Sequence, residues 1–204
     1  MSDAPLNATI HLVRHGEVEN PKGVIYGRLP GYNLSERGQK QAEEAGRYLS
    51  ERAVGAIWAS PLERAQETAA AIGAFHPSLE IVTDHRLIES ETTLEGVGKT
   101  LWAFIRSPRH WWHLRDPWTP SWGESFEQIR TRMVDAIADA VAAARGRELV
   151  VVSHQTPVLV ARLALTRRRM PPWLARLPCQ TGSVTTIVLE DGRAIGGDYF
   201  VPSS

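Results

Sequence analysis

Apolar positions follow two different periods along this chain. Short, nearly continuous apolar runs predict buried strands, and apolar residues three and four positions apart predict helices. Strands are expected at residues 9–14, 53–59, 79–83, 148–153, 183–189 and 194–200. Helices are expected at about 35–52, 60–74, 125–141 and 156–165. This alternation predicts a three-layer α/β/α sandwich around a mainly parallel sheet, in one domain spanning residues 1–204.

Capping residues mark the expected helix starts. Ser35 is placed to cap the first helix. For the second, Ser60 is expected to cap and Glu63 to complete a capping box. Ser125 and Gln128 have the same spacing before the third.

The composition limits the classes of protein to consider. Lys plus Arg and Asp plus Glu both number 23, which argues against a nucleic-acid binder that relies on a general basic field. A local basic pocket for a small anion is still compatible. The one cysteine, Cys179, excludes a disulfide within the chain, argues against a cysteine-based zinc site, and is expected to be a buried thiol.

Targeting and membrane signals are not found in the sequence. Residues 1–8 are polar and contain no apolar signal region. No apolar run approaches the roughly 18–20 residues of a membrane span. The three arginines at 167–169 are interpreted as a solvated cluster at a helix end, favoured by the helix dipole. A cytoplasmic protein without membrane or nucleic-acid partners is expected.

Unusual chemistry is concentrated at three strand-to-helix junctions. Arg14, His15 and Gly16 follow the first strand, Arg64 lies in the first turns of the second helix, and His154 follows the strand at 148–153. Parallel strands end on one edge of a sheet, where ligands bind. Arginine supplies a planar fork for oxyanions, neutral histidine can act as a nucleophile, and glycine lets the backbone approach a ligand. The combination predicts a pocket for a phosphate dianion.

Five sequence blocks then carry a family resemblance. They are LVRHGE at 12–17, NLSERG at 33–38, SPLERAQETA at 60–69, GES at 123–125 and VSH at 152–154. In this order they resemble the motifs of the histidine phosphatase superfamily, in its phosphoglycerate-mutase-like branch. The resemblance covers nearly the whole chain.

The resemblance implies a mechanism at the matching positions. His15 would attack phosphorus and become a phosphohistidine, which water then hydrolyses. Arg14 and Arg64 would hold the phosphoryl oxygens, and His154 would add a hydrogen bond. No metal or other cofactor is expected, because the cationic side chains stabilise the spreading charge.

A general acid must also protonate the leaving oxygen. In relatives it is a carboxyl that follows a leucine after the second arginine segment, and Glu89 takes that position here. Glu91 and Glu95 are the alternatives.

The chain departs from the family pattern at several places. Gln155 stands where a glycine often follows the second histidine, so a bulkier side chain is expected at the pocket edge. Pro21 occupies a position where the family commonly has a phosphate-binding Asn, and Asn20 precedes it. Asn20 and Arg28 are further candidates for substrate binding, with a solvated loop residue as the alternative for Arg28.

A tryptophan-rich segment at 100–122 interrupts the pattern. It holds five of the seven tryptophans and three prolines that prevent a long helix. We interpret it as an insertion that forms a lid over the substrate. A packed subdomain core or a homodimer contact is the alternative.

The function expected from these features is that of a metal-independent phosphomonoesterase acting on a small phosphorylated metabolite. A phosphoglycerate-mutase-type phosphotransferase is the first alternative, although such mutases resemble longer chains than these 204 residues. A non-catalytic module that binds a phosphorylated ligand is the second.

Overall fold

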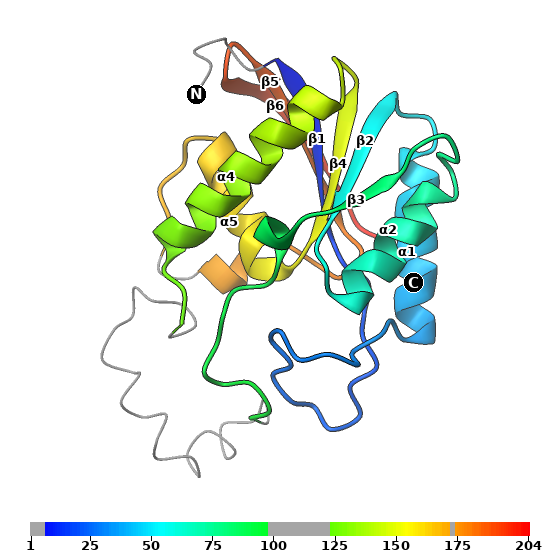
Figure 1. Cartoon of the computed structure of the whole chain (residues 1–204), viewed down its shortest axis with the longest axis vertical. Helices are drawn as coiled ribbons and strands as arrows, with labels where there is room; N and C mark the ends of the chain where they lie inside the picture. Colours follow the sequence, from blue (N-terminus) through cyan, green and yellow to red (C-terminus); the bar gives the residue numbers. More distant parts are fainter. Residues whose placement is uncertain (1–6, 98–122, 172–173) are drawn as a thin grey trace.

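The chain folds around one six-stranded sheet (Figure 1). The computed structural model describes residues 7–97, 123–171 and 174–204. The strands lie in the order β3-β2-β4-β1-β5-β6. β1 to β4 are mutually parallel, whereas β5 and β6 extend the sheet as an antiparallel pair. The strand bounds are β1 Ala8–Arg14, β2 Val54–Ala59, β3 Ile81–Thr83, β4 Glu148–Ser153, β5 Val184–Glu190 and β6 Arg193–Phe200. The expectation of a mainly parallel α/β sheet is confirmed; the segment 100–122 lies outside the described residues.

Helices cover both faces of this sheet (Figure 1). α1 (Glu36–Leu49) and α2 (Glu63–Gly73) cover one face, and α4 (Phe126–Ala143) and α5 (Gln155–Leu165) cover the other. Two short 3-10 helices, η1 (His85–Leu87) and η3 (Leu174–Arg176), lie in connecting segments. Among the helices in the described ranges, none is long and apolar enough to cross a membrane.

The apolar strands supply two separate cores. In β1, Ile10 and Leu12 pack into the core with α4 and α5, whereas Val13 packs into the core with α1 and α2. Successive strand side chains point to opposite faces, so a strand covered on both sides must be apolar throughout. This accounts for the nearly continuous apolar run of β4.

Two of the three expected caps are present. Ser35 accepts a hydrogen bond from the backbone N–H of Gly38, and Ser125 forms a complete capping box with Gln128. The expected cap of α2 by Ser60 is wrong: this helix begins at Glu63, after Leu62, without a side-chain cap. The Ser60 hydroxyl instead lies 2.7 Å from Nε2 of His154.

The first turn of α1 packs directly on the chain that leaves β1. A Cβ atom at Gly38 would collide with the carbonyl oxygen of Glu17, and one at Gly16 would collide with the carbonyl oxygen of Gly38. The missing side chain of Gly16 therefore serves this close packing, whereas the sequence assigned it to the approach of a ligand.

We predict that Gly38→Ala destabilises the protein although alanine favours helix formation by about 1 kcal/mol. The added methyl group meets backbone that cannot rotate away, so the net loss in the free energy of unfolding is expected to be about 1–3 kcal/mol. Urea unfolding of the variant measures it. Lys40→Ala, at an exposed position of the same helix, is the control and should change stability by less than about 0.5 kcal/mol. A Gly38→Ala variant as stable as the wild type would contradict the packing argument.

Candidate active site

The three strand-to-helix junctions that carry the candidate arginines and histidines meet at one edge of the sheet. β1 and β4 pair in parallel, with Arg14 opposite Ser153, so His15 and His154 leave the sheet side by side. Their ring centroids are 5.1 Å apart. Arg64 comes from the first turn of α2. A pocket of about 300 Å³ opens here, lined by Arg14, His15, Ile25, Tyr26, Gly27, Glu89, Ser90, Thr92, Leu94, Gln155 and Thr156.

His15 is held as a neutral imidazole with a defined tautomer. Its Nδ1 lies 2.7 Å from the carbonyl oxygen of Gly16, which can only accept, so Nδ1 carries the proton and Nε2 carries the lone pair. The ring is 1% exposed. Burial, followed by the charges of Arg64 and Arg14, lowers the pKa of His15 well below its ordinary value.

Each arginine is anchored by one backbone carbonyl and keeps further donors. Arg64 is fully buried and donates to the carbonyl oxygen of Gly27 at 2.7 Å. Arg14 donates to the carbonyl oxygen of Cys179 at the same distance. Nε and Nη1 of Arg64 and Nε of Arg14 are buried without a partner among the described residues. Buried donors of this kind favour an anionic acceptor between them.

His154 occupies the other side of His15. It is fully buried, and Ser60 bonds its Nε2, whereas its Nδ1 has no hydrogen-bond partner in the described part of the chain. Burial is the main cause that lowers the pKa of His154 well below its usual value, followed by the proximity of His15. The ring is therefore neutral and can offer one hydrogen bond.

Glu89 is the candidate acid that the structure brings into the pocket, where it lies with Arg14 and His15. Burial raises its pKa more than the N–H of Ser90 and the two arginines lower it. Of the two alternatives, Glu95 accepts from the backbone N–H of Arg28, and Glu91 is exposed. Neither lines the pocket.

Arg28 supports the segment that carries this acid. Its Nε donates to the carbonyl oxygen of Glu89 at 2.8 Å, and its guanidinium also bonds Glu124. Arg132 bonds the same Glu124 and the carbonyl oxygen of Arg86. The sequence made Arg28 a candidate for substrate binding, and in the structure its guanidinium bonds the Glu89 carbonyl and Glu124. The sequence did not reveal Arg132, which lies outside every motif.

The remaining candidates differ in position. Gln155 lines the pocket, and its amide donates to the carbonyl oxygen of Ala175 at 3.3 Å. Asn20 is not brought to the pocket, because its side chain bonds both the N–H and the carbonyl of Val24. It lines a separate hollow beside the start of α1.

Tyr26 is a pocket residue that the sequence did not single out. The guanidinium carbon of Arg64 lies 4.9 Å from the centre of its ring, a cation–π distance. Burial raises the pKa of its hydroxyl, which also bonds Arg14. The one available signal was its place in a long glycine- and proline-rich loop, since such loops in compact domains are usually functional.

Comparison with known proteins agrees with this geometry. Residues 10–196 match the family model of the histidine phosphatase superfamily (branch 1). An uncharacterized protein of Mycobacterium tuberculosis is 46% identical over 202 residues, covering 98% of this chain and 99% of its own. Phosphoserine phosphatase 1 of Hydrogenobacter thermophilus is 30% identical over 190 residues, covering 90% and 88%.

Solved structures show the same fold. The chain matches mycobacterial glucosyl-3-phosphoglycerate phosphatase with a TM-score of 0.76 and 26% identity, over 97% of this chain and 100% of that one. The protein therefore belongs to the histidine phosphatase superfamily, and its relatives include proteins named as phosphatases.

Proposed function

We propose that the protein is a metal-independent phosphomonoesterase that forms a phosphohistidine on His15. One observation carries the proposal: a buried, neutral His15 with Nδ1 tied to the Gly16 carbonyl lies beside two arginines that keep free donors. A nucleophilic nitrogen and an oxyanion site are thus placed together.

In the first step, the Nε2 lone pair attacks phosphorus as the bond to the leaving oxygen breaks. Arg14 and Arg64 stabilise the negative charge on the three remaining oxygens, and His154 adds a hydrogen bond. The leaving oxygen takes a proton from the Glu89 carboxyl, which the raised pKa keeps available.

In the second step, water attacks the phosphohistidine. Glu89, now a carboxylate, accepts a proton from that water, the P–N bond breaks, and inorganic phosphate leaves with His15 neutral again. Stabilisation by the guanidinium groups supplies the role that a metal ion has in other phosphoryl-transfer enzymes.

A small phosphorylated metabolite is the substrate class that we favour. The pocket of about 300 Å³ is at the lower limit of usual small-molecule sites. The relatives' names refer to phosphoserine and to glucosyl-3-phosphoglycerate, which are small phosphate esters.

We predict that wild-type protein, mixed with p-nitrophenyl phosphate and quenched rapidly in alkali, contains a phosphoryl group on His15 that acid releases. His15→Ala should form none and should lose hydrolysis by several orders of magnitude, since the covalent route is removed. Peptide mapping of the quenched protein locates the group.

His85→Ala is the matched control, because this histidine is exposed and does not line the pocket. It should keep both phosphoenzyme and turnover. Absence of phosphoenzyme and of hydrolysis in the wild type would favour the binding module instead. Phosphoenzyme that passes its group to a phosphoglycerate and hardly at all to water would favour the mutase.

We predict that kcat/KM falls both at low and at high pH. The reaction needs neutral His15 and protonated Glu89, so kcat/KM falls when pH drops through the lowered pKa of His15 and when it rises through the raised pKa of Glu89. Glu89→Gln should lose the fall at higher pH. The ratio of the variant to the wild type across pH removes the ionisation of the substrate from the comparison.

Glu89→Gln should also depend on the leaving group. For an alkyl phosphate we expect a loss in kcat/KM of about 10²–10⁴-fold, and for p-nitrophenyl phosphate a much smaller one, because nitrophenolate leaves without a proton. The comparison uses kcat/KM because this quantity does not include the later hydrolysis of the phosphohistidine, in which Glu89 also acts. Glu91→Gln is the control and should resemble the wild type. Equal losses in the two variants, or the same loss for both substrates, would contradict the assignment of Glu89 as the acid.

A further inference from the structure

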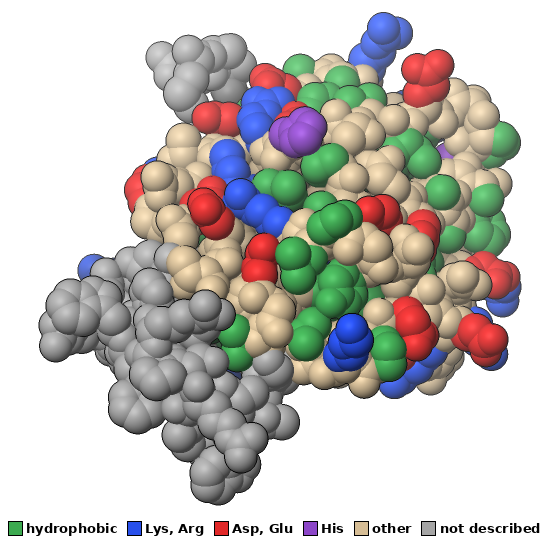
Figure 2. Space-filling model, turned by 60° about the horizontal axis from the view of Figure 1, so that its bottom comes forward, with side chains coloured by type: hydrophobic (Ala, Val, Ile, Leu, Met, Phe, Trp, Pro, Cys, Tyr) green, Lys and Arg blue, Asp and Glu red, His purple; other side chains and the backbone are tan. Residues whose placement is uncertain are grey.

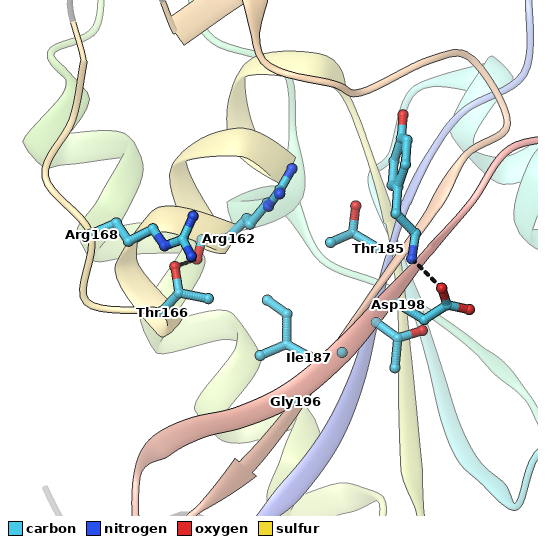
Figure 3. A pocket seen from close by; sticks show the side chains of 10 residues that line it. Arg162, Thr166, Arg168, Thr185, Ile187, Gly196 and Asp198 are labelled. Atoms are coloured by element: carbon cyan, nitrogen blue, oxygen red, sulfur yellow. Dashed lines mark hydrogen bonds between the residues drawn. The ribbon is translucent and has the colours of Figure 1, made fainter.

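A second hollow, of about 390 Å³, lies between α5 and the antiparallel strands β5 and β6 (Figure 3). It is larger than the candidate active site and shares no lining residue with it. Its lining comprises Arg162, Thr166, Arg168, Thr185, Thr186, Ile187, Gly196, Gly197, Asp198 and Tyr199. No step of the proposed reaction uses it.

Two cations border this hollow. In Figure 3, Arg162 and Arg168 lie on its helix side, opposite the strand residues. Neither forms an ion pair with any described residue, and the side chain of Arg162 makes one long bond, 3.4 Å, to the carbonyl oxygen of Pro178. Asp198 also lines the hollow, but its carboxylate accepts from the hydroxyl of Tyr48, which belongs to α1 on the other face of the sheet. The guanidinium groups therefore keep donors for an added anion.

The strand side of the hollow is of mixed chemistry. Ile187 and the ring of Tyr199 provide apolar surface, and Thr185 adds a hydroxyl group. Gly196 adds no side chain to fill the space, and a Cβ atom there would meet no other atom within 4 Å. Apolar surface with a few convergent polar groups is typical of a site for a small molecule.

The hollow is connected to Arg14 through one short segment, Pro178–Gln180. Arg162 donates to the carbonyl oxygen of Pro178, and the N–H of Gln180 donates to the hydroxyl of Tyr199 at 2.9 Å. Between them, the carbonyl oxygen of Cys179 accepts the 2.7 Å bond from Arg14. Two residues of the hollow thus hold both sides of the carbonyl that anchors a phosphate-binding arginine.

We propose that this hollow is a second binding site, for a small organic anion that carries a phosphate or carboxylate group on an apolar body. The oxyanion bonds Arg162 and Arg168, and the body lies on Ile187 and the ring of Tyr199. When the anion binds, Arg162 leaves the Pro178 carbonyl, and the Cys179 carbonyl that anchors Arg14 is held less firmly. Phosphate then binds more weakly at the candidate active site. By linkage, phosphate weakens the second ligand by the same factor.

Methyl NMR of isoleucine-labelled protein can observe both sites at once, because Ile187 lines the hollow and Ile25 lines the active-site pocket. The probes are phenylphosphonate, which has no ester bond to hydrolyse, and benzoate, which separates a carboxylate ligand from a phosphoryl one. We expect a saturable shift of the Ile187 methyl signal with at least one probe. No saturable shift with either, up to about 10 mM, would overturn the proposal.

Arg162→Ala combined with Arg168→Ala should weaken this binding at least tenfold, since two charge-assisted bonds are lost. Arg169→Ala, which removes an exposed charge of the same cluster outside the hollow, should change it less than twofold. Equal binding to the double variant and the wild type would overturn the proposal. The double variant should still respond to inorganic phosphate at Ile25, which keeps this test apart from that of the proposed function.

The coupling is measured by titrating inorganic phosphate against the Ile25 signal, with and without a saturating probe. We expect a phosphate Kd about fivefold weaker with the probe, in the range usual for coupled sites. The effect must disappear in the Arg162→Ala, Arg168→Ala double variant. An effect that persists there is competition at the active site and would overturn the coupling, as would an unchanged Kd in the wild type.

Discussion

Four basic side chains are removed from water at one edge of the sheet, and the rest of the site depends on this constraint. His15, His154 and Arg64 are almost completely removed from solvent, and Arg14 lines the pocket together with His15. Histidine answers burial by losing its proton, whereas arginine cannot and must find acceptors. Backbone carbonyl groups supply these acceptors: Gly27 accepts one hydrogen bond from Arg64, and Cys179 accepts one from Arg14. On the face shown in Figure 2, histidine is sparse, and lysine and arginine side chains lie among acidic ones.

The same dehydration sets the base and the acid in opposite directions. Burial is the largest cause of the lowered pKa of His15 and also of the raised pKa of Glu89. The nearby arginines lower both pKa values: they strengthen the effect on the histidine and oppose it on the carboxyl. A single water-poor pocket thus favours a neutral nucleophile and a protonated donor together. Separate environments are not required, because the two groups carry charge in opposite protonation states.

Local sequence patterns predicted the sheet, its helices and the residues at the strand ends. They could do so because the periodicity of apolar residues and helix capping involve residues only a few positions apart. They failed where a bond between distant residues decided the outcome. Ser60 has the sequence of a cap, yet its hydroxyl bonds His154, 94 positions away. The bonds of Arg28 to the Glu89 carbonyl and to Glu124 likewise join residues 61 and 96 positions apart, which no local pattern indicates. The anchors at Gly27 and Cys179 are carbonyl oxygens, which every residue has, so side-chain identity could not reveal them.

The backbone anchors also explain why strands without catalytic side chains matter to the site. Arg14 ends β1, and its own N–H donates to the carbonyl of Ser183 while Gly182 donates back to the Arg14 carbonyl. Cys179, which anchors the guanidinium, belongs to the same turn before β5. Both the backbone and the side chain of Arg14 are therefore positioned by the chain entering the antiparallel pair. Because Tyr199 of β6 in turn bonds that turn, the geometry of phosphate binding depends on how β5 and β6 are held against α5.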